Sequence, residues 1–287
     1  LRAQQELLAL GITGWQDAWV TPGTLAAYRS LADSGRLTAR VVGALWWDRH
    51  RGIEQIDDLQ AQRERAGGGG GFFPTTVKIM TYGVLENYTG ALLEPFCDGC
   101  GGHTDNHGLA YVERELLAEA VTKLDALGFQ VHMHAIGDRA ARIGLDAVER
   151  ARAAGPARGT RHTIAHLELV AADDLARFAR LGVAPNVQAL WAQADPYITE
   201  LTIPLIGDER SLDLYPIGSL FANAEVVAAG SDWPVSSADP LAAIEVGVTR
   251  RADDSGPGPG WLPEQRADLA QMLAAYTRGG AWLDGEE

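Results

Sequence analysis

The chain has 287 residues, of which 46% are hydrophobic and 22% are charged. A single α/β barrel has about this size, so one domain is expected over residues 1–287. The 38 acidic residues outnumber the 24 basic residues and give a net charge of −14, which disfavours binding to nucleic acid. No apolar run reaches the roughly 18 residues that would indicate a membrane span, so a membrane is not an expected partner either.

The beginning of the chain and its cysteines bear on its origin. The opening segment, Leu1-Arg-Ala-Gln-Gln5, has neither an initiator Met nor the basic-then-apolar pattern of a signal peptide. We therefore expect a piece of a longer chain, and a signal peptide upstream stays open. Cys97 and Cys100 form one C-x-x-C pair, which is no disulfide framework. A reducing, cytoplasmic compartment is the expectation.

Apolar, strand-like runs alternate with helical stretches along the whole chain. In chain order, the pattern predicts a helix at 1–9, a strand at 12–19, a helix at 24–34, a strand at 38–45, a helix at 52–65, a strand at 75–81, a helix at 113–127, a strand at 129–134, a helix at 139–154, a strand at 161–166, a helix at 172–181, a strand at 183–188, a less regular helix at 211–221 and a strand at 226–231. This alternation indicates βαβ units and a parallel sheet. Seven strands favour an α/β, TIM-like (β/α)8 barrel lacking one strand over a doubly wound sheet.

Histidines stand near the ends of two predicted strands, where a barrel carries its catalytic residues. His132 and His134 are two residues apart, so both point to one side of their strand. They suit a shared metal ion, or one metal ligand beside one substrate contact; a pair of hydrogen-bonded core histidines is the alternative. His166 lies at the end of the next strand and is a better ligand candidate than His162, for which packing alone is a sufficient explanation.

A lysine and an aspartate complete the candidate site. Lys78 is one of only two lysines and lies in an apolar strand, where burial lowers the pKa of an ammonium group. A neutral lysine amine reacts with carbon dioxide to give a carbamate, whose two oxygens can bridge two metal ions; a salt bridge to Asp232 or Glu86 is the alternative. Asp232 ends the last strand and suits a metal ligand, a proton shuttle or both. A helix N-cap would also explain it.

Together, these residues resemble the amidohydrolase superfamily, most closely its family 3 branch, which includes N-substituted formamide deformylases. The resemblance covers nearly the whole chain and is most specific in Val131-His-Met-His-Ala-Ile-Gly-Asp138 and Gly230-Ser-Asp-Trp-Pro234. It implies a TIM-like barrel with one or two divalent metal ions, usually zinc. By position, Lys78 would be a carbamylated bridging lysine, His134 and His166 would be metal ligands, and Asp232 would be ligand and proton shuttle.

The sequence departs from that family at three places. No His-x-His pair of a first strand precedes Ile12, so the predicted strands correspond to strands 2 to 8 of the barrel. The chain also stops before the C-terminal part of the family's small β-sandwich, which again predicts a fragment. Tyr82-Gly83 stands where an Asp-Gly pair commonly follows the lysine, and this puts in doubt any role that the missing aspartate would have had.

The favoured function is hydrolysis of a non-peptide C–N bond, in an amide or formamide, by metal-activated water. Asp232 would protonate the departing amine, and His132 would stabilise the oxyanion. The expected partners are a small-molecule amide-type substrate and, in a homo-oligomer, further copies of the chain. Two alternatives remain: hydrolysis of esters or cyclic imides at the same site, and a catalytically silent or truncated barrel that acts as a binding protein.

The loop that contains the two cysteines has the ligand types of a compact zinc site. Its candidates are Cys97, Cys100, His103 and His107. A loop that covers the substrate is the favoured interpretation, because the segment is rich in Gly and Asp turns and follows the Lys78 strand.

Overall fold

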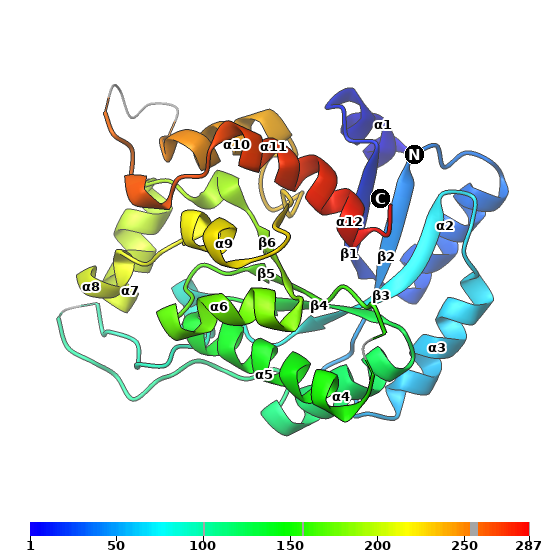
Figure 1. Cartoon of the computed structure of the whole chain (residues 1–287), viewed down its shortest axis with the longest axis horizontal. Coiled ribbons are helices and arrows are strands. Elements are labelled where there is room, and N and C mark those ends of the chain that lie inside the picture. The colour runs from blue at the N-terminus through cyan, green and yellow to red at the C-terminus, as the bar shows by residue number, and fades with distance from the viewer. Residues whose placement is uncertain (100, 157, 253–257, 287) are drawn as a thin grey trace.

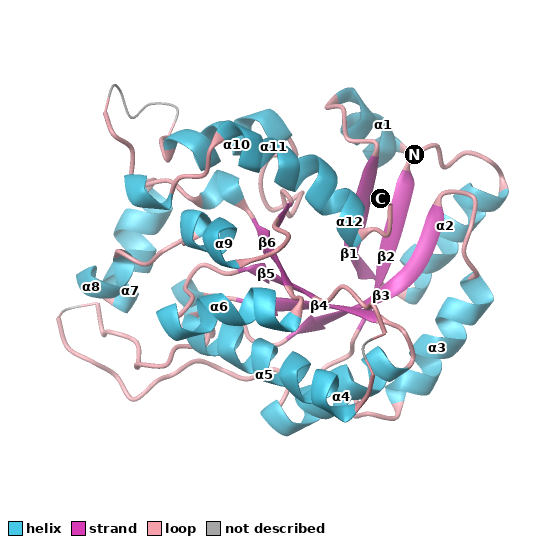
Figure 2. Cartoon of the chain, viewed as in Figure 1, coloured by secondary structure: helices cyan, strands magenta, loops and turns pink. Residues whose placement is uncertain are grey.

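The computed structural model describes residues 1–99, 101–156, 158–252 and 258–286. Its centre is one curled sheet of seven parallel strands that are paired in chain order (Figure 1 and Figure 2). The strands are β1 (Gly14–Val20), β2 (Arg40–Trp46), β3 (Phe72–Met80), β4 (Gln130–Ala135), β5 (Thr163–His166), β6 (Ala184–Val187) and β7 (Ala228–Ala229). This arrangement confirms the predicted α/β class. Among the described strands, β1 and β7 are the two edges of the sheet.

Helices alternate with the strands and lie along the outside of the curl (Figure 1). The helices of the first two thirds are α1 (Arg2–Ala9), α2 (Pro22–Asp33), α3 (Gln55–Ala66), α4 (Arg114–Ala126), α5 (Asp138–Ala154) and α6 (Ala172–Leu181). Those that follow are α7 (Ile203–Ile206), α8 (Asp208–Ser211), α9 (Ile217–Asn223), α10 (Pro240–Thr249), α11 (Leu269–Ala274) and α12 (Gly280–Leu283). Short 3-10 or π-helical turns lie at Leu85–Asn87, Ala189–Trp191, Tyr197–Thr202, Pro263–Gln265 and Ala275–Gly279.

None of the described helices combines the length and the apolar character that a membrane crossing requires.

The predicted elements agree with the structure except at a few boundaries. Strand β3 begins at Phe72, three residues earlier than predicted. The five consecutive glycines at 67–71 precede it, and they end in a tight bridge between Gly69 and Phe72. The predicted last strand is too long, since β7 keeps only two residues. The predicted helix over 211–221 is interrupted. Helix α8 ends at Ser211 and α9 begins at Ile217, directly after Pro216, which has no N–H to donate.

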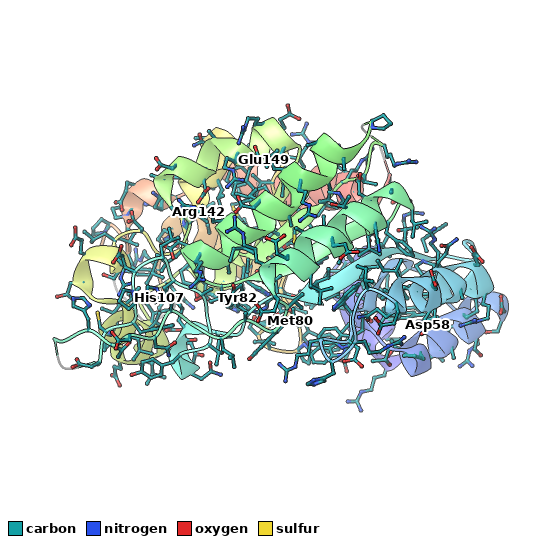
Figure 3. All side chains as sticks on the ribbon, turned by 90° about the horizontal axis from the view of Figure 1, so that it is seen from below. Asp58, Met80, Tyr82, His107, Arg142 and Glu149 are labelled. Carbon is teal, nitrogen blue, oxygen red and sulfur yellow. The ribbon has the colours of Figure 1, made fainter. Side chains whose placement is uncertain are left out.

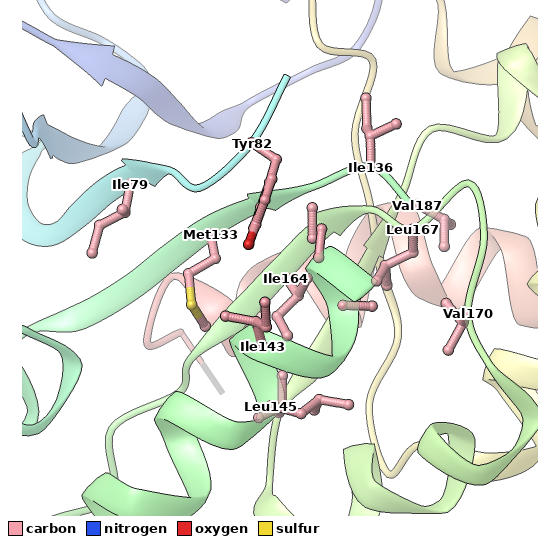
Figure 4. Close-up of a cluster of buried hydrophobic side chains, with 14 of the residues drawn as sticks. Ile79, Tyr82, Met133, Ile136, Ile143, Leu145, Ile164, Leu167, Val170 and Val187 are labelled. Atoms are coloured by element: carbon pink, nitrogen blue, oxygen red, sulfur yellow. The ribbon is translucent and has the colours of Figure 1, made fainter. Parts of the chain in front are cut away.

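The core lies between the sheet and the outer helices. Alternate residues of the strands point outward, so Met133 of β4 and Ile164 of β5 meet Ile143 of α5 in an apolar cluster (Figure 4). All three are buried, and each such side chain contributes roughly 1.5–3 kcal/mol when it is removed from water. The residues between them point to the inside of the curl, where the polar residues of the strands gather.

Ion pairs join α5 and α6 on the outer surface. Arg142 and Glu149 mark this face in Figure 3. Arg142 pairs with the buried Asp174 at 2.7 Å, and Arg177 pairs with Asp174, Asp146 and Glu149 at 2.9, 2.7 and 2.8 Å. This network fixes the two helices against each other on the side away from the candidate site.

The segment that follows α12 crosses the beginnings of several strands. The Gln130 side chain donates a hydrogen bond to the carbonyl of Leu283 at 3.1 Å, and Arg40 donates one to the carbonyl of Asp284 at 2.8 Å. Arg161 donates to the carbonyl of Trp282 and lies over the Trp282 ring. Residues 282–284 therefore tie the starts of β2, β4 and β5 together at the N-terminal end of the sheet.

His162 belongs to this N-terminal end and has a structural role. Its Nδ1 accepts the backbone N–H of Val131 at 3.1 Å, so Nε2 carries the proton and donates to Asp125 at 2.9 Å. Arg152 also donates to Asp125, at 2.9 Å, and so does the hydroxyl of Thr160. The hydrogen bond from His162 and these neighbours hold the pKa of Asp125 at about 2. The preference for His166 over His162 as a site residue agrees with this geometry.

We expect Asp125→Asn to lower the free energy of unfolding by about 1–3 kcal/mol at pH 7, because three donors lose their charged acceptor. Because the folded pKa of Asp125 is about 2, below the value of roughly 3.9 in an unfolded chain, the stabilisation is full above about pH 4. It is lost as pH falls towards 2. Urea unfolding of both proteins at pH 7 and pH 3 measures this, and a difference that does not shrink at low pH would contradict it.

Candidate active site

The register of β3 and β4 places the candidate site residues in rows. Lys78 of β3 lies directly opposite His132 of β4, and Met80 lies opposite His134. Opposed residues of a parallel pair point to the same side, and here that side is the inside of the curl. Lys78, His132 and His134 are each 5–6% exposed. The structure thus brings three of the predicted residues together at the C-terminal half of the sheet.

His132 is oriented by a residue that sequence reasoning did not find. Its Nδ1 lies 2.5 Å from Oε1 of Gln16, on β1. The amide oxygen can only accept, so Nδ1 carries the proton and Nε2 has a free lone pair. That Nε2 is buried without a hydrogen-bond partner, and burial lowers the pKa of His132 well below its usual value. His132 is therefore a neutral acceptor that faces the site.

His134 has the opposite tautomer. Its Nε2 donates to the backbone carbonyl of Gly83 at 2.9 Å, which leaves the lone pair on Nδ1. Gly83 must be a glycine, because a Cβ there would lie 1.8 Å from the hydroxyl of Thr89. Metal-binding histidines usually donate their second N–H to a carbonyl or carboxylate, and His134 has this arrangement. Burial lowers the pKa of His134 to about 3, so the ring is neutral.

His166 closes the group from β5. Its ring lies 4.4 Å from the ring of His134, centroid to centroid, and is stacked on Trp191 at 5.6 Å. Nδ1 of His166 is buried and has no hydrogen-bond partner. The residue has a φ of +78°, and Leu167 after it has a φ of +53°. Two successive left-handed residues are uncommon for side chains of this kind, and such strain is concentrated at functional sites.

Lys78 is buried without a salt bridge. Among the described residues, no carboxylate lies within 4.0 Å of its amine, so the salt-bridge alternative does not hold. Burial lowers the pKa of Lys78 to about 8, and the attraction of Asp232 only partly opposes this. A substantial fraction of the amine is therefore neutral near pH 8, which is the form that reacts with carbon dioxide.

Asp232 lies in an exposed loop after β7 and not at the end of a long buried strand. Its φ is +53°, and it caps no described helix, since the N-cap of α10 is Asp239. The N-cap explanation is thus excluded. Partial removal from water raises the pKa of Asp232, whereas the charge of Lys78 lowers it. Asp232 is thus near enough to Lys78 for the two charges to interact.

The glycine and aspartate of the His-Ala-Ile-Gly-Asp segment contact the loop that follows β3. Gly137 has a φ of +99°, and a Cβ there would lie 2.0 Å from the carbonyl of Ala91. Asp138 accepts hydrogen bonds from the N–H of Leu93 and of Arg139, both at 2.9 Å. These contacts fix the loop that follows β3 against the start of α5, so the Gly-Asp pair has a structural role beside His134.

Two glutamates, Glu86 and Glu168, follow the C-terminal ends of β3 and β5. They were not predicted as a site, although Glu86 was considered as a partner of Lys78. Glu168 follows His166 by two residues and is 5% exposed, and its Oε2 has no hydrogen-bond partner. Burial, and secondarily the charge of Glu86, raise the pKa of Glu168 to about 8. The signal in the sequence was the single carboxylate within the apolar run His166-Leu-Glu-Leu-Val170.

The cysteine loop gives partial information. Cys97 is buried, and its Sγ lies 3.9 Å from Nδ1 of His103, whereas His107 is hydrogen-bonded to the carbonyl of Leu92 at 3.1 Å. Cys100 lies outside the described residues. The zinc hypothesis for this loop stays a prediction.

The residues of the site fit a divalent metal ion in part. Across the described ranges, no group of three or more His, Cys, Asp or Glu side chains is arranged to hold a metal ion. The rings of His134 and His166 do lie side by side, and Nδ1 of His166 is buried without a hydrogen-bond partner. Lys78 would add two anionic oxygens once it is carbamylated. Imidazole nitrogens and carbamate oxygens are ligand types that zinc accepts, so His134, His166 and a carbamylated Lys78 would be the candidates to hold such an ion.

Comparison with known proteins places this geometry in a family. A model of the "Amidohydrolase family" matches residues 1–287, so the chain belongs to the amidohydrolase family. It is 31% identical over 211 residues to Protein LONG AFTER FAR-RED 3 of Arabidopsis thaliana, covering 71% of this chain and 34% of that protein. It is 27% identical over 208 residues to the putative amidohydrolase YtcJ of Bacillus subtilis strain 168, covering 72% of this chain and 37% of that protein.

Solved structures show the same fold. An uncharacterized metal-dependent hydrolase from Pyrococcus furiosus matches with a TM-score of 0.81 and 26% identity, covering 99% of this chain and 54% of that one. A second one, from Pyrococcus horikoshii OT3, matches with a TM-score of 0.81 and 29% identity over the same shares. The chain thus spans about a third of the curated relatives and about half of these structures. Both Pyrococcus proteins are described as metal-dependent hydrolases.

We expect Lys78→Met to stabilise the metal-free protein at pH 7 by at most about 3 kcal/mol, because it removes a buried amine whose pKa is lowered to about 8. Because the pKa is lowered, the free-energy cost of burying the charged amine is full below about pH 8 and falls as pH rises towards about 10.5. Urea unfolding at pH 7 and pH 10, without bicarbonate, measures the effect. Lys123→Met, at an exposed lysine paired with Glu119, is the matched control and should change little.

Proposed function

We propose that this chain carries the active site of a metal-dependent amidohydrolase that cleaves a non-peptide C–N bond in a small amide or formamide. The observation that supports this most directly is Lys78, a buried amine with a lowered pKa and no ion pair, directly opposite His132 and beside two further neutral histidines. A lysine that only served stability would be paired or exposed. The family to which the chain belongs points to the same chemistry.

Lys78 has the chemistry of a metal-bridging ligand. Its neutral amine attacks carbon dioxide, the new C–N bond forms, and a proton leaves the nitrogen, which gives an anionic carbamate. His134 offers Nδ1, because Nε2 is occupied by Gly83. A metal ion held by these groups would activate water as the nucleophile and polarise the carbonyl of the substrate.

Asp232 is the proposed proton carrier. It lies in the exposed loop after β7, interacts electrostatically with Lys78, and has a pKa that partial burial raises. A carboxylate with a raised pKa takes a proton from water and returns it to the departing amine more readily than a fully solvated one. Because the loop around it is exposed, the amine product can leave from this side.

His132 suits an acceptor role in this structure. Its Nδ1 proton is bound to Gln16, so Nε2 offers a lone pair to an N–H group of the substrate. The oxyanion role predicted from the sequence requires a proton on Nε2, hence the other tautomer and a rotated Gln16 amide. Both roles place His132 in contact with the substrate, and Gln16 decides between them.

Metal content tests the proposed site. We expect purified protein to hold about one or two zinc-like ions per chain, and Lys78→Ala to hold clearly fewer, as measured by plasma mass spectrometry. Lys123→Ala is the matched control, because Lys123 is the only other lysine and is exposed. Folded wild-type protein without metal, after incubation with zinc and bicarbonate, would contradict the proposal and favour a silent barrel.

Activity tests the role of Asp232. We expect Asp232→Asn to lower kcat on a panel of N-substituted amides and formamides by about 10²–10⁴-fold, the usual range for loss of a general acid–base group. Its metal content should fall less than that of Lys78→Ala. Asp173→Asn, at an exposed aspartate on α6, is the control. Equal rates on matched esters and amides would favour the ester-hydrolase alternative instead.

A further inference from the structure

A second polar cluster lies beside the histidines, and it rests on a pair of carboxyl groups that none of the proposed chemistry uses. Glu168 comes from the turn after β5, and Glu86 comes from the 3-10 turn Leu85–Asn87 after β3. The two side chains are close enough for each charge to act on the other. Since both follow C-terminal strand ends, they lie on the same face of the sheet as Lys78 and His166.

Glu168, the more buried of the two glutamates, has one carboxyl oxygen without a hydrogen-bond partner. The hydroxyl of Tyr215 is hydrogen-bonded to Glu168, but Oε2 of Glu168 is buried without any partner. A buried carboxyl oxygen that accepts nothing costs about 1–3 kcal/mol or more, so a protein does not keep it without a gain elsewhere. The backbone N–H of Tyr215 also donates to the carbonyl of Glu168 at 2.7 Å, which holds the residue in place.

Glu86, the less buried of the two glutamates, is hydrogen-bonded to an exposed tyrosine. Glu86 is half-buried and accepts the hydroxyl of Thr202 at 2.5 Å and a hydrogen bond from Tyr197. Tyr197 is 52% exposed. Through its hydrogen bond to Glu86, the exposed Tyr197 is therefore connected with the buried cluster around Glu168.

The missing component is a positive charge. Within the described residues, neither glutamate has a Lys, Arg or His nitrogen within 4.0 Å, whereas most other buried carboxylates here are paired. A nitrogen cation matches this cluster, because its N–H groups would donate to Glu86 and to the free Oε2 of Glu168, and because aromatic faces attract it. A metal ion is a weaker match, because no third ligand of a usual kind joins the pair.

We propose that Glu86 and Glu168 form a subsite for a positively charged nitrogen, a primary ammonium or guanidinium group, on the amide substrate. This inference rests on the proposed function for the bond that is cleaved, but not for the binding of the cation. The substrate would place its amide at the histidines and extend its charged end towards Tyr197. The net charge of −14 would also raise the local concentration of such cations.

Binding without turnover tests the subsite. Monoacetylated diaminobutane and its neutral isostere N-pentylacetamide are titrated into the metal-free chain by calorimetry, in phosphate buffer because Tris is itself an amine. We expect the cationic amide to bind about 10-fold more tightly or better, which corresponds to about 1.4 kcal/mol. Glu168→Gln and Glu86→Gln should each abolish most of this preference. Glu200→Gln, at an exposed glutamate of the same segment as Tyr197, should retain it.

Equal binding of the two amides by the wild-type chain would overturn the subsite, and so would a preference that survives in both glutamate variants. If Glu168→Gln does not fold, as judged by its thermal transition, Glu86→Gln alone decides. The two proposals fail separately. A cation preference without hydrolysis would leave the subsite and remove the proposed function, whereas hydrolysis without a cation preference would do the reverse.

Discussion

The candidate site depends on the register between β3 and β4. Because Lys78 is opposite His132, a one-residue slip of this pair would turn the lysine, or both histidines, towards the outer helices. The apolar residues between them, such as Met133, prevent such a slip, since they fill the core under α5. The same alternation therefore packs apolar side chains on one side of the sheet and brings Lys78, His132 and His134 together on the other. Gln16 and Gly83 then fix which nitrogen of each ring faces the site.

Buried polar groups lie at both ends of the sheet, and their hydrogen bonding differs. At the N-terminal end, Asp125 and His162 are fully hydrogen-bonded, which is what stability requires. At the C-terminal end, nitrogen or oxygen atoms of His132, His166 and Glu168 are buried without partners. Such atoms occur elsewhere too, for example Nε of Arg40 at the N-terminal end, but three of them gather here on neighbouring residues of the proposed site, which supports the proposal. This grouping also explains why both of our proposals concern the same face.

The sequence was sufficient for most of the fold and for the grouping of several candidate site residues. Apolar, strand-like runs between helical stretches located all seven strands. Strand-end positions selected Lys78, His134 and His166, and the structure brings these residues together because side-chain direction follows from the backbone. Gln16 and Tyr215 could not be found in this way. Each acts through a contact between segments far apart in the chain, 116 residues for Gln16 and His132, and no local pattern records such a contact. The length of β7 was misjudged because its apolar run continues into an irregular loop.

The segment after α12 has a consequence for the order of folding. Trp282, Leu283 and Asp284 hold the starts of β5, β4 and β2 across sequence separations of 121, 153 and 244 residues. Contacts of such long range form slowly, because the entropy of closing a large loop is lost before any contact is gained. On the ribosome, β2 would exist for more than 200 residues of synthesis before its partner Asp284 appears. During that interval the starts of β2, β4 and β5 lack the hydrogen bonds that residues 282–284 later provide.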